Sequence, residues 1–267
     1  MCFEFDALPP ELPDGRAVIA GGAAAESLTV TAGDGNRFAA ALAESPAPSG
    51  PGVVILPDVR GLYRFYVELA ERFAEAGHHA IAFDYFGRTA GTEERGEDFE
   101  YMPHVEATTM EGVQTDLAAA RAALAERTGA SQFASVGFCF GGGHSFWAGT
   151  NPNLGLDAVI GFYGLLNPAR RGITNRPSLV EGGDRMKLPV LGLFGGDDES
   201  IPADDIEAFD AGLERAGVDH EIVTYPGAPH SFFDRKQEEF ADASADAWTR
   251  VLDFLAAEPV KAKPVRL

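Results

Sequence analysis

The chain has 267 residues, of which 45% are hydrophobic and 23% charged. This content supplies a sizeable core and excludes intrinsic disorder, and the length favours one large α/β domain over residues 1–267 rather than two small ones. Acidic residues outnumber basic ones 41 to 21, which gives a formal charge of −20. Such a chain repels phosphate backbones and anionic membrane surfaces, so we expect no nucleic-acid or membrane partner.

Two cysteines, Cys2 and Cys139, are too few for a disulfide framework and indicate a reducing compartment. The first residues are acidic and hold no apolar stretch of the kind that a secretory signal needs. Residues 129–156 contain no Asp, Glu, Lys or Arg, but their many Gly, Ser, Asn and His residues exclude a membrane span. We therefore expect a soluble, cytoplasmic protein.

The N-terminal part of the chain predicts an irregular arm followed by a hairpin. Residues 1–16 are rich in Pro and acidic side chains. Two β-like runs follow at 27–31 and 37–42, and Gly-Asp-Gly-Asn at 33–36 between them has the composition of a tight turn. The Pro- and Gly-rich residues 45–52 are expected to form a loop.

From residue 53 onward, short apolar runs alternate with stretches of helical pattern. This alternation implies a mainly parallel sheet covered by helices on both faces, with the hairpin adding antiparallel strands at one edge. Segments 87–110 and 165–187 lack such a pattern and are expected to be a long loop and a long polar excursion that shape the substrate site. The expected strands are 53–56, 80–83, 133–138, 158–163, 190–194 and 221–225, and the expected helices are 65–76, 112–127, 141–148, 203–216 and 238–257.

The most informative motif is Ser-Val-Gly-Phe-Cys-Phe-Gly-Gly-Gly at 135–143, between an expected strand and an expected helix. Gly137-x-Cys139-x-Gly141 has the spacing of a nucleophile elbow, with sulfur in place of the usual hydroxyl. The nucleophile of an elbow lies at a strained corner, so small residues are needed two positions to either side, and the helix N-terminus favours a thiolate. The alternative is a small buried cysteine in a glycine-rich turn.

An elbow of this kind is followed along the chain by an acid and then a histidine. Asp198 follows the strand at 190–194, and we prefer it to Asp197, which is interpreted as a solvated turn residue. His230 follows the last strand, in a loop that presents it at the carboxyl edge of the sheet. Together these features predict a Cys139–His230–Asp198 triad.

The remaining histidines and the glycine-rich segments give no better hypothesis. His104 and His144 are weaker candidates near the expected site, whereas His78, His79 and His220 are interpreted as surface or packing residues. No histidine pair has metal-site spacing, no G-x-G-x-x-G opens the first strand–helix unit, and no G-x-x-x-x-G-K-[ST] occurs. The sequence predicts neither a metal nor another cofactor.

These residues resemble those of a known family. The run Gly-Phe-Cys-Phe-Gly-Gly at 137–142, with Asp198 and His230, is similar to the dienelactone hydrolase (carboxymethylenebutenolidase-like) family of α/β-hydrolases. Residues 57–61 stand where that family has its oxyanion loop, and 84–88 stand where it has an arginine for a substrate carboxylate. The resemblance implies an α/β-hydrolase fold and hydrolysis of small esters or lactones.

The resemblance covers roughly residues 50–255, and two positions depart from the family pattern. Asp58 replaces a Glu that contacts the resting nucleophile, so Asp58 either holds Cys139 in an inactive state or is a solvated loop acid. Asp234 stands where the family has a second arginine, and Arg235 is one position further on. These departures concern a pocket for dicarboxylate-like lactones rather than ester hydrolysis itself.

The mechanism that the resemblance implies is nucleophilic catalysis. His230 takes or shares the proton of Cys139, Asp198 stabilises the imidazolium, and the thiolate attacks an ester or lactone carbonyl to give a thioester. The backbone N–H groups of Phe140 and Val59 hold the oxyanion, and water activated by His230 releases the acid.

Candidate substrate-binding residues come from the loops of the same edge. Arg88 is expected to pair a substrate carboxylate or, alternatively, to form a salt bridge to the acidic stretch 93–97, and Arg60 and Arg64 are weaker candidates of the same kind. The aromatic residues are expected as a group either to line an apolar pocket or to pack in the core: Tyr85, Phe86, Tyr101, Phe140 and Phe232.

The leading hypothesis is a cysteine-dependent ester or lactone hydrolase that acts on a small molecule as a monomer or small homo-oligomer. Two alternatives stay open: a non-catalytic α/β-hydrolase-fold protein that binds a ligand, and a redox-sensing thiol protein. The complete triad argues against the first. The second has no need of Asp198 and no resolving cysteine near Cys139.

Overall fold

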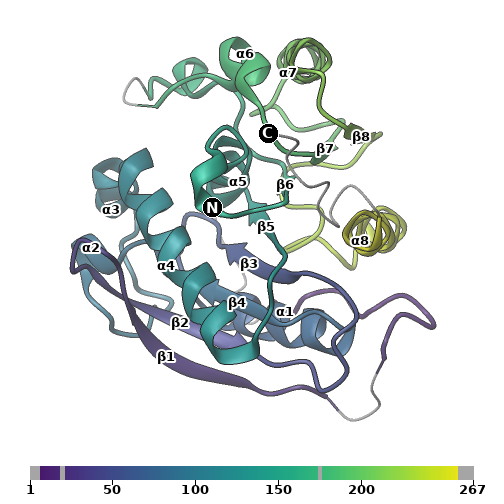
Figure 1. The fold of residues 1–267 in the computed structure, drawn as a ribbon. Coiled ribbons are helices and arrows are strands. Elements are labelled where there is room, and N and C mark those ends of the chain that lie inside the picture. The colour runs from purple at the N-terminus through teal and green to yellow at the C-terminus, as the bar shows by residue number, and fades with distance from the viewer. Residues whose placement is uncertain (1–6, 19–21, 174–175, 258–267) are drawn as a thin grey trace, which may run out of the picture.

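A computed structural model describes residues 7–18, 22–173 and 176–257 of the chain (Figure 1). Its centre is an eight-stranded sheet with the order β1-β2-β4-β3-β5-β6-β7-β8. The hairpin strands β1 and β2 are antiparallel to each other, and β2 is antiparallel to β4, whereas all other neighbours are parallel. The strands are β1 Ala25–Thr31, β2 Arg37–Ala43, β3 Gly52–Leu56, β4 Ala80–Phe83, β5 Phe133–Phe138, β6 Ala158–Phe162, β7 Val190–Gly195 and β8 His220–Tyr225. The expected mainly parallel sheet with an antiparallel hairpin at one edge is confirmed.

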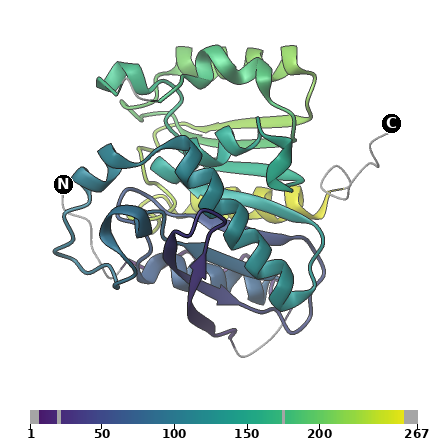
Figure 2. The same ribbon diagram turned by 60° about the vertical axis from the view of Figure 1, so that its left-hand side comes forward.

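Helices cover both faces of the sheet (Figures 1 and 2). On one face, α1 and α8 pack together through the rings of Phe73 and Trp248, whose centroids are 4.8 Å apart. On the other face, α5 packs against α7 through Phe146 and Phe209 at 5.1 Å, and α4 lies beside α5. The main helices are α1 Arg64–Glu75, α4 Met110–Thr128, α5 Phe140–Ala148, α7 Ala203–Ala216 and α8 Ala241–Ala256.

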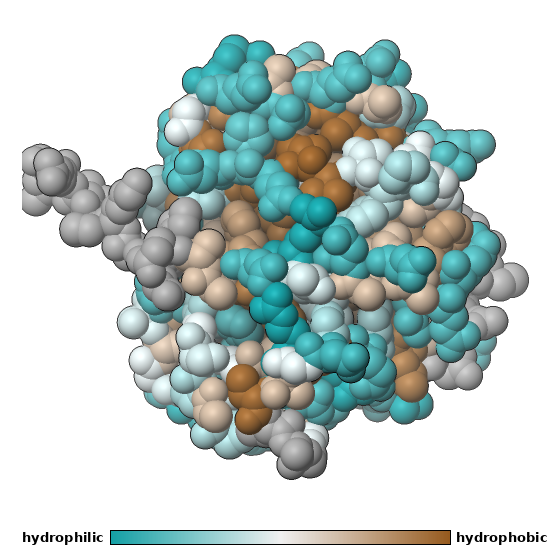
Figure 3. All heavy atoms as spheres, turned by 90° about the vertical axis from the view of Figure 1, so that its right-hand side faces the viewer, coloured by the Kyte–Doolittle hydropathy of each residue, from teal (hydrophilic) through white to brown (hydrophobic). Residues whose placement is uncertain are grey.

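The central strands β3 to β7 are buried along their whole length, which explains why they read as continuous apolar runs. The edge strand β8 is mostly exposed or half-buried instead, with Ile222 and Val223 half-buried and only Tyr225 buried among its residues. Figure 3 views the molecule from the side on which β8 lies in Figure 1, and hydrophobic residues gather in its upper part. This edge is therefore less completely covered than the centre of the sheet.

Local signals set the ends of the helices. The side chain of Thr109 caps α4 by accepting a hydrogen bond from the N–H of Gly112 at 3.1 Å. Gly129 ends the same helix with φ +74°, a left-handed conformation that suits glycine. The apolar face of α1, which includes Leu69 and Phe73, is buried against the sheet.

Two long segments hold more structure than their sequence suggests. The expected loop 87–110 contains α2 Gly87–Ala90 and α3 Met102–Ala107, so the expectation of one long loop is wrong. Pro103 lies in the first turn of α3, where proline is tolerated because that N–H has no helical partner. The segment 165–187 contains the short helices η2 Pro168–Arg171, α6 Leu179–Gly182 and η3 Gly183–Arg185, and η1 Pro152–Leu154 precedes it.

The N-terminal arm holds neither helix nor strand over residues 7–16, and Cys2 lies outside the described residues. Across the part of the chain that the structure describes, no helix has the length and apolarity that crossing a bilayer requires. Because β3 to β8 are parallel, the segments that follow them meet at one edge of the sheet. The residues that the sequence singles out as a site follow β3, β4, β5, β7 and β8.

Candidate active site

Cys139 occupies the sharp turn between β5 and α5, with φ +53° and ψ −110°. Its backbone N–H is held by the carbonyl of Phe162 at 3.0 Å. A Cβ added to Gly137 would lie 2.1 Å from the carbonyl oxygen of Gly141, and one added to Gly141 would lie 2.2 Å from that of Leu56. The need for small residues on either side of the turn is therefore confirmed, and Cys139 is held in a strained conformation that the fold enforces.

Asp198 and His230 come together at the ends of β7 and β8. His230 Nδ1 lies 2.6 Å from Asp198 Oδ2, and the second carboxylate oxygen accepts a hydrogen bond from the N–H of Ser200 at 2.8 Å. Asp198 is buried, whereas Asp197 is exposed. The carboxylate that contacts the histidine is thus the one preferred from the sequence, and it is fixed on both oxygens.

Cys139 is a free, half-buried thiol whose side chain interacts with His230. Burial by itself disfavours the charged imidazole. The electrostatic effect of Cys139, together with the hydrogen bonds that His230 makes with Asp198 and Cys139, outweighs burial and raises the pKa of His230 to about 10. Asp198 on one side and Cys139 on the other therefore favour the imidazolium form of His230.

The two backbone N–H groups expected to hold an oxyanion are left without acceptors. Within the described ranges, neither Phe140 nor Val59 donates its N–H to another group, while the N–H groups of the flanking residues Cys139, Gly141 and Arg60 are all bonded. Phe140 opens α5, where the first N–H groups have no helical partner. These free donors suit an oxygen that carries developing negative charge.

Two further strained residues surround the histidine. Tyr163, directly after β6, has φ +37°, and Ser231 has φ +63°. The ring of Tyr163 is fully buried and lies 5.0 Å from that of His230. Sequence reasoning missed Tyr163, because an aromatic residue that ends a buried strand looks like any other core residue. Its contact restricts where the His230 ring can turn.

Asp58 is buried rather than solvated, so the interpretation as a solvated loop acid is wrong. Its carboxylate accepts hydrogen bonds from Arg60, with Nη2 at 2.7 Å and the backbone N–H at 2.8 Å, and from the hydroxyl of Tyr63 at 3.4 Å. These partners, and not the thiol of Cys139, occupy the Asp58 carboxylate in this conformation. Arg60 is correspondingly engaged by Asp58.

Asp234 is a second buried carboxylate next to the site. Burial and the negative charge of Asp58 raise the pKa of Asp234 above its usual range. Arg235 donates its backbone N–H to Asp234 and its Nη2 to Ser231 Oγ at 2.7 Å. The departure from the family pattern at this position therefore places an acid, and not a cation, inside the fold.

In this conformation Arg88 is paired with carboxylates of the protein itself, and its expected role toward a substrate carboxylate stays a prediction. Its Nη1 lies 2.6 Å from Asp34 and its Nη2 lies 2.8 Å from Asp116, so both ends of the guanidinium are paired with carboxylates. The alternative expectation, a salt bridge to 93–97, is wrong, because the partners come from the hairpin and from α4. Arg64 pairs with Glu68 on the surface of α1.

Most of the candidate aromatic residues are packing residues. Phe86 and Phe232 are fully buried, and Tyr85 is 1% exposed and donates its hydroxyl to the carbonyl of Pro57 at 3.0 Å. In this conformation the rings of Phe86 and Phe232 pack in the core, which is the alternative expected for them, and their contact with a substrate stays a prediction. Tyr101, before α3, is half-buried and is the more accessible member of the group.

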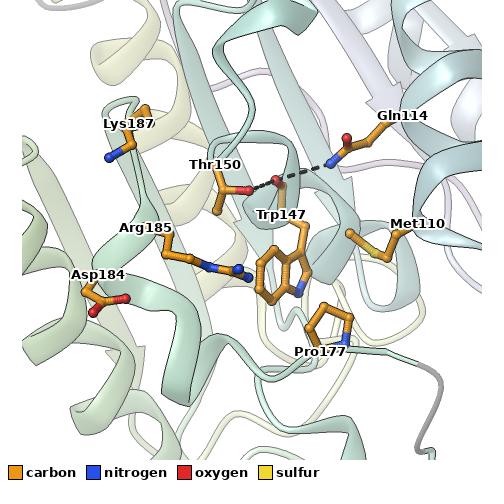
Figure 4. A pocket seen from close by; sticks show the side chains of 8 residues that line it. All are labelled: Met110, Gln114, Trp147, Thr150, Pro177, Asp184, Arg185 and Lys187. Atoms are coloured by element: carbon orange, nitrogen blue, oxygen red, sulfur yellow. Dashed lines mark hydrogen bonds between the residues drawn. The ribbon is translucent and has the colours of Figure 1, made fainter.

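A pocket of about 570 Å³ is lined by Trp147 near the C-terminal end of α5, whereas Cys139 precedes the first residue of that helix (Figure 4). Arg185 lies over the indole of Trp147, with its Cζ 4.9 Å from the ring centroid. The pocket contains none of the triad residues, and its lining residues are Met110, Gln114, Trp147, Thr150, Pro177, Asp184, Arg185 and Lys187. Over the described ranges, no cluster of three His, Cys, Asp or Glu residues is suited to a metal ion.

The fold and the turn at Cys139 define the class of protein. A mainly parallel sheet with helices on both faces, a strained residue between β5 and α5, and an acid and a histidine after later strands are the features of an α/β-hydrolase. The expected fold class is confirmed by this architecture and by the structural neighbours given below.

The chain belongs to the dienelactone hydrolase family, which it matches over residues 38–258. It is 30% identical over 245 residues to a Yersinia pestis protein provisionally assigned as a carboxymethylenebutenolidase, covering 89% of this chain and 90% of that one. A Synechocystis protein with the same provisional assignment is 31% identical over 219 residues, covering 78% and 86% of the two chains. The resemblance inferred from the motif is thereby confirmed.

Solved structures agree with this assignment. A Klebsiella pneumoniae protein provisionally assigned as a dienelactone hydrolase has a TM-score of 0.74 and 25% identity, covering 88% of this chain and 99% of that one. A dienelactone hydrolase-like promiscuous phosphotriesterase from metagenomic libraries has a TM-score of 0.72 and 25% identity, covering 88% and 98%. The chain is thus a member of a family of hydrolases that act on lactones and esters.

Proposed function

We propose that this protein hydrolyses small esters or lactones with Cys139 as the nucleophile, His230 as the group that transfers protons, and Asp198 as the residue that orients His230. The observation that carries the proposal is the position of His230. Its Nδ1 lies 2.6 Å from Asp198, while the charge and hydrogen bonding of Cys139 contribute to a pKa of about 10. A histidine held in this way is suited to take the proton of the thiol, to stabilise the resulting thiolate as imidazolium, and then to protonate a leaving group.

In the first half of the reaction, the thiolate sulfur of Cys139 attacks the ester or lactone carbonyl and forms a carbon–sulfur bond. The carbonyl oxygen becomes an oxyanion, and the free N–H groups of Phe140 and Val59 are its donors. Each such donor is worth about 3 kcal/mol of barrier. As the tetrahedral intermediate collapses, the carbon–oxygen bond breaks and His230 gives its proton to the departing alkoxide.

In the second half, His230 is neutral and takes a proton from water, whose oxygen attacks the thioester carbonyl. The sulfur leaves as a thiolate and the carboxylic acid is released. The imidazolium is restored beside the thiolate, so the cycle consumes one water and needs no other reactant. The buried carboxylate of Asp198, held by Ser200, keeps the Nδ1 atom of His230 directed toward it throughout.

The proposal is tested by trapping the acyl group. The enzyme is mixed with para-nitrophenyl acetate, quenched in acid before steady state, and examined by intact-protein and peptide mass spectrometry. We expect one acetyl group on the peptide that contains Cys139. We also expect no acetyl group and no turnover with Cys139→Ala, and weak turnover with Cys139→Ser, because the same histidine can activate a hydroxyl.

Three results would overturn the proposal: full turnover by Cys139→Ala, an acetyl group on another residue in the productive time range, or a wild-type enzyme that turns over no ester. A redox thiol protein gives a different pattern, in which peroxide consumption survives His230→Ala. A ligand-binding protein without catalysis gives neither acetylation nor turnover. The three function classes are therefore separated by one set of variants.

A further inference from the structure

Asp234 and Tyr163, two side chains beside the triad, each carry an enclosed polar atom without a partner among the described residues. Asp234 is 1% exposed, and its Oδ2 is bonded to no group that the structure describes. Its salt-bridge partner Arg235 has its Nε 3.8 Å from the other carboxylate oxygen, Oδ1. The hydroxyl of the fully buried Tyr163 also has no partner within the described ranges. Because an unpaired buried oxygen costs free energy, both atoms need a hydrogen-bond partner.

Other buried polar groups near the site have partners of their own. The carboxylate of Asp58 accepts a hydrogen bond from Arg60 at 2.7 Å. The hydroxyl of Tyr66 accepts one from the backbone N–H of Asp58 at 3.0 Å, and the hydroxyl of Tyr85 donates to the carbonyl of Pro57 at 3.0 Å. The two unpaired atoms thus differ from these neighbours, although the neighbours are buried to a similar degree.

The fold holds both side chains close to His230. The ring of Tyr163, directly after β6, lies 5.0 Å from the ring of His230. Asp234 lies four residues after His230 along the chain. The connection between them is closed by a hydrogen bond from Arg235 Nη2 to Ser231 Oγ at 2.7 Å, while Arg235 also donates its backbone N–H to Asp234. The histidine and the two unpaired groups therefore belong to one packed unit.

The hydroxyl of Tyr163 is also within electrostatic reach of Asp234 and of the thiol. Burial raises the pKa of Tyr163 well above its ordinary value, and Asp234, Cys139 and Asp58, in that order, raise it further. The effect of a charged group weakens with distance, so Asp234 and Cys139 are both neighbours of this hydroxyl. The two unpaired atoms are thus placed beside each other and beside the proposed nucleophile.

A water molecule is the smallest group that satisfies both atoms at once. It accepts a hydrogen bond from the hydroxyl of Tyr163 and donates one to Asp234 Oδ2, and the second bond offsets part of the cost of burying that carboxylate. We infer that Asp234 and Tyr163 hold a water molecule beside Cys139 and that this water attacks the thioester; this inference rests on the hydrolytic function proposed above.

The inference adds two positioning residues to the second half of the reaction. The water donates its other hydrogen to His230, which takes that proton as the water oxygen bonds to the carbonyl carbon of the thioester. The carbon–sulfur bond then breaks, the sulfur leaves as a thiolate, and the carboxylic acid is released. Formation of the thioester uses no water, so Asp234 and Tyr163 should matter for its hydrolysis and not for its formation.

The test separates the two halves with para-nitrophenyl acetate. Release of para-nitrophenolate in stopped flow gives the rate of acylation, and the decay of acetyl-Cys139 after removal of excess ester, followed by quenching and mass spectrometry, gives the rate of deacylation. Tyr163→Phe keeps the ring against His230 and removes only the hydroxyl. We expect it to slow deacylation about 10-fold and to change acylation less than about 3-fold.

Two variants at Asp234 and one control complete the set. Asp234→Leu should slow deacylation at least as much as Tyr163→Phe, whereas Asp234→Asn keeps a hydrogen-bonding group in place and should lose less. Tyr225→Phe is the matched control, because the rings of Tyr225 and Tyr163 both pack on Phe232, at 4.9 and 5.6 Å, but the hydroxyl of Tyr225 donates to Asp246. Both of its rates should equal those of the wild type.

Thermal unfolding tests the water site without any turnover. If Tyr163 donates to a held water molecule, Tyr163→Phe should lower the thermal midpoint by about 2 °C. If its hydroxyl is simply unpaired, the same change should leave the midpoint unchanged or raise it, because an unpaired buried hydroxyl is costly. A midpoint that does not fall would overturn the water site.

The kinetic outcomes keep the inference apart from the proposed function. If acetyl-Cys139 forms and decays at the same rate in the wild type and in Tyr163→Phe, the hydrolytic function stands and the inference is wrong. Equal losses in acylation and deacylation would also overturn it, because they would show that the hydroxyl only maintains the shape of the site. If the wild type forms no acetyl-Cys139, the proposed function fails and the role of the water fails with it.

Discussion

The carboxyl ends of β5, β7 and β8 and the two long segments 87–110 and 165–187 differ in how they are built. At the strand ends, Cys139 and Asp198 follow the buried strands β5 and β7, and His230 follows the edge strand β8 after a short connection. In the long segments, side chains find partners on distant elements, as Arg88 does with Asp116 in α4. The side chains of the first region are placed by local backbone geometry, and those of the second are placed by tertiary contacts.

The comparison teaches that the two regions tolerate change differently. A side chain at the end of a central strand has one direction to point, because the backbone on both sides is fixed by the sheet. A charged side chain in a long connection takes the direction in which it finds an oppositely charged partner. A substitution of that partner therefore changes the direction of the side chain. The predictions that follow probe this difference, beginning with the strand ends.

The largest effect is expected from Asp198→Asn. The amide keeps the shape of the carboxylate but does not stabilise imidazolium, and by analogy with other triads we expect kcat to fall about 10⁴-fold. Asp197→Asn is the matched control, because Asp197 is adjacent and exposed, and its activity should equal that of the wild type. Steady-state kinetics with a para-nitrophenyl ester measures both. Comparable losses in the two variants would mean that the charge of the loop, and not the contact with His230, matters.

The next effect is on stability. In Gly141→Ala the new Cβ would lie 2.2 Å from the carbonyl oxygen of Leu56 and 2.3 Å from that of Pro57, and backbone atoms of a central strand do not move away easily. We expect a loss of about 3 kcal/mol or more in the free energy of unfolding. Gly96→Ala, where no atom lies within 4 Å of an added Cβ, should be nearly neutral. Urea unfolding followed by circular dichroism checks the pair, and similar midpoints for both variants would show that the elbow is not tightly packed.

The order and spacing of the glycines, the cysteine, the acid and the histidine were enough to predict the elbow and to choose Asp198 over Asp197. These features depend on steric rules within a few residues and on the fact that parallel strands end together. The sheet was predictable for the same reason, since strands buried on both faces read as apolar runs.

The contacts of the arginines in the two long segments were not predictable in this way. The carboxylates that form salt bridges with Arg88 are Asp34 in the hairpin and Asp116 in α4, and nothing in the local sequence of Arg88 indicates them. Arg176 and Arg185 both stand in the polar segment 165–187, but the first lies over the ring of Phe140 and the second over the indole of Trp147. The polarity of a segment indicates that it is a connection. The partner of each cation in it depends on the whole fold.

Arg88→Gln tests how a paired cation of the segment 87–110 contributes to stability and to substrate selectivity. Asp116 is fully buried, so removing its partner leaves a carboxylate with less compensation, and we expect about 1–3 kcal/mol of destabilisation. Because Arg88 is committed to Asp34 and Asp116, we expect it to leave a substrate carboxylate unrecognised. The ratio of kcat/KM for para-nitrophenyl hemisuccinate, which carries a carboxylate, to that for the uncharged para-nitrophenyl isocaproate should therefore not change. Arg64→Gln, which breaks an exposed pair with Glu68, should change stability by less than about 0.5 kcal/mol. A selective loss of hemisuccinate hydrolysis in Arg88→Gln would return the carboxylate role to Arg88.

The smallest effect is expected in the pH dependence of the wild type. His230 has its pKa raised to about 10, so the ring is a cation below that pH and loses its proton above it. If imidazolium is the acid that protonates the leaving group, kcat/KM should stay level from neutral pH upward and decline as pH passes about 10. Asp198→Asn removes a group that raises this pKa, so its decline should begin at lower pH. Initial rates corrected with Cys139→Ala for spontaneous hydrolysis give both profiles. A kcat/KM that rises through neutral pH would instead indicate a neutral imidazole that removes the proton of a thiol, and would show that the charged pair is not the resting state.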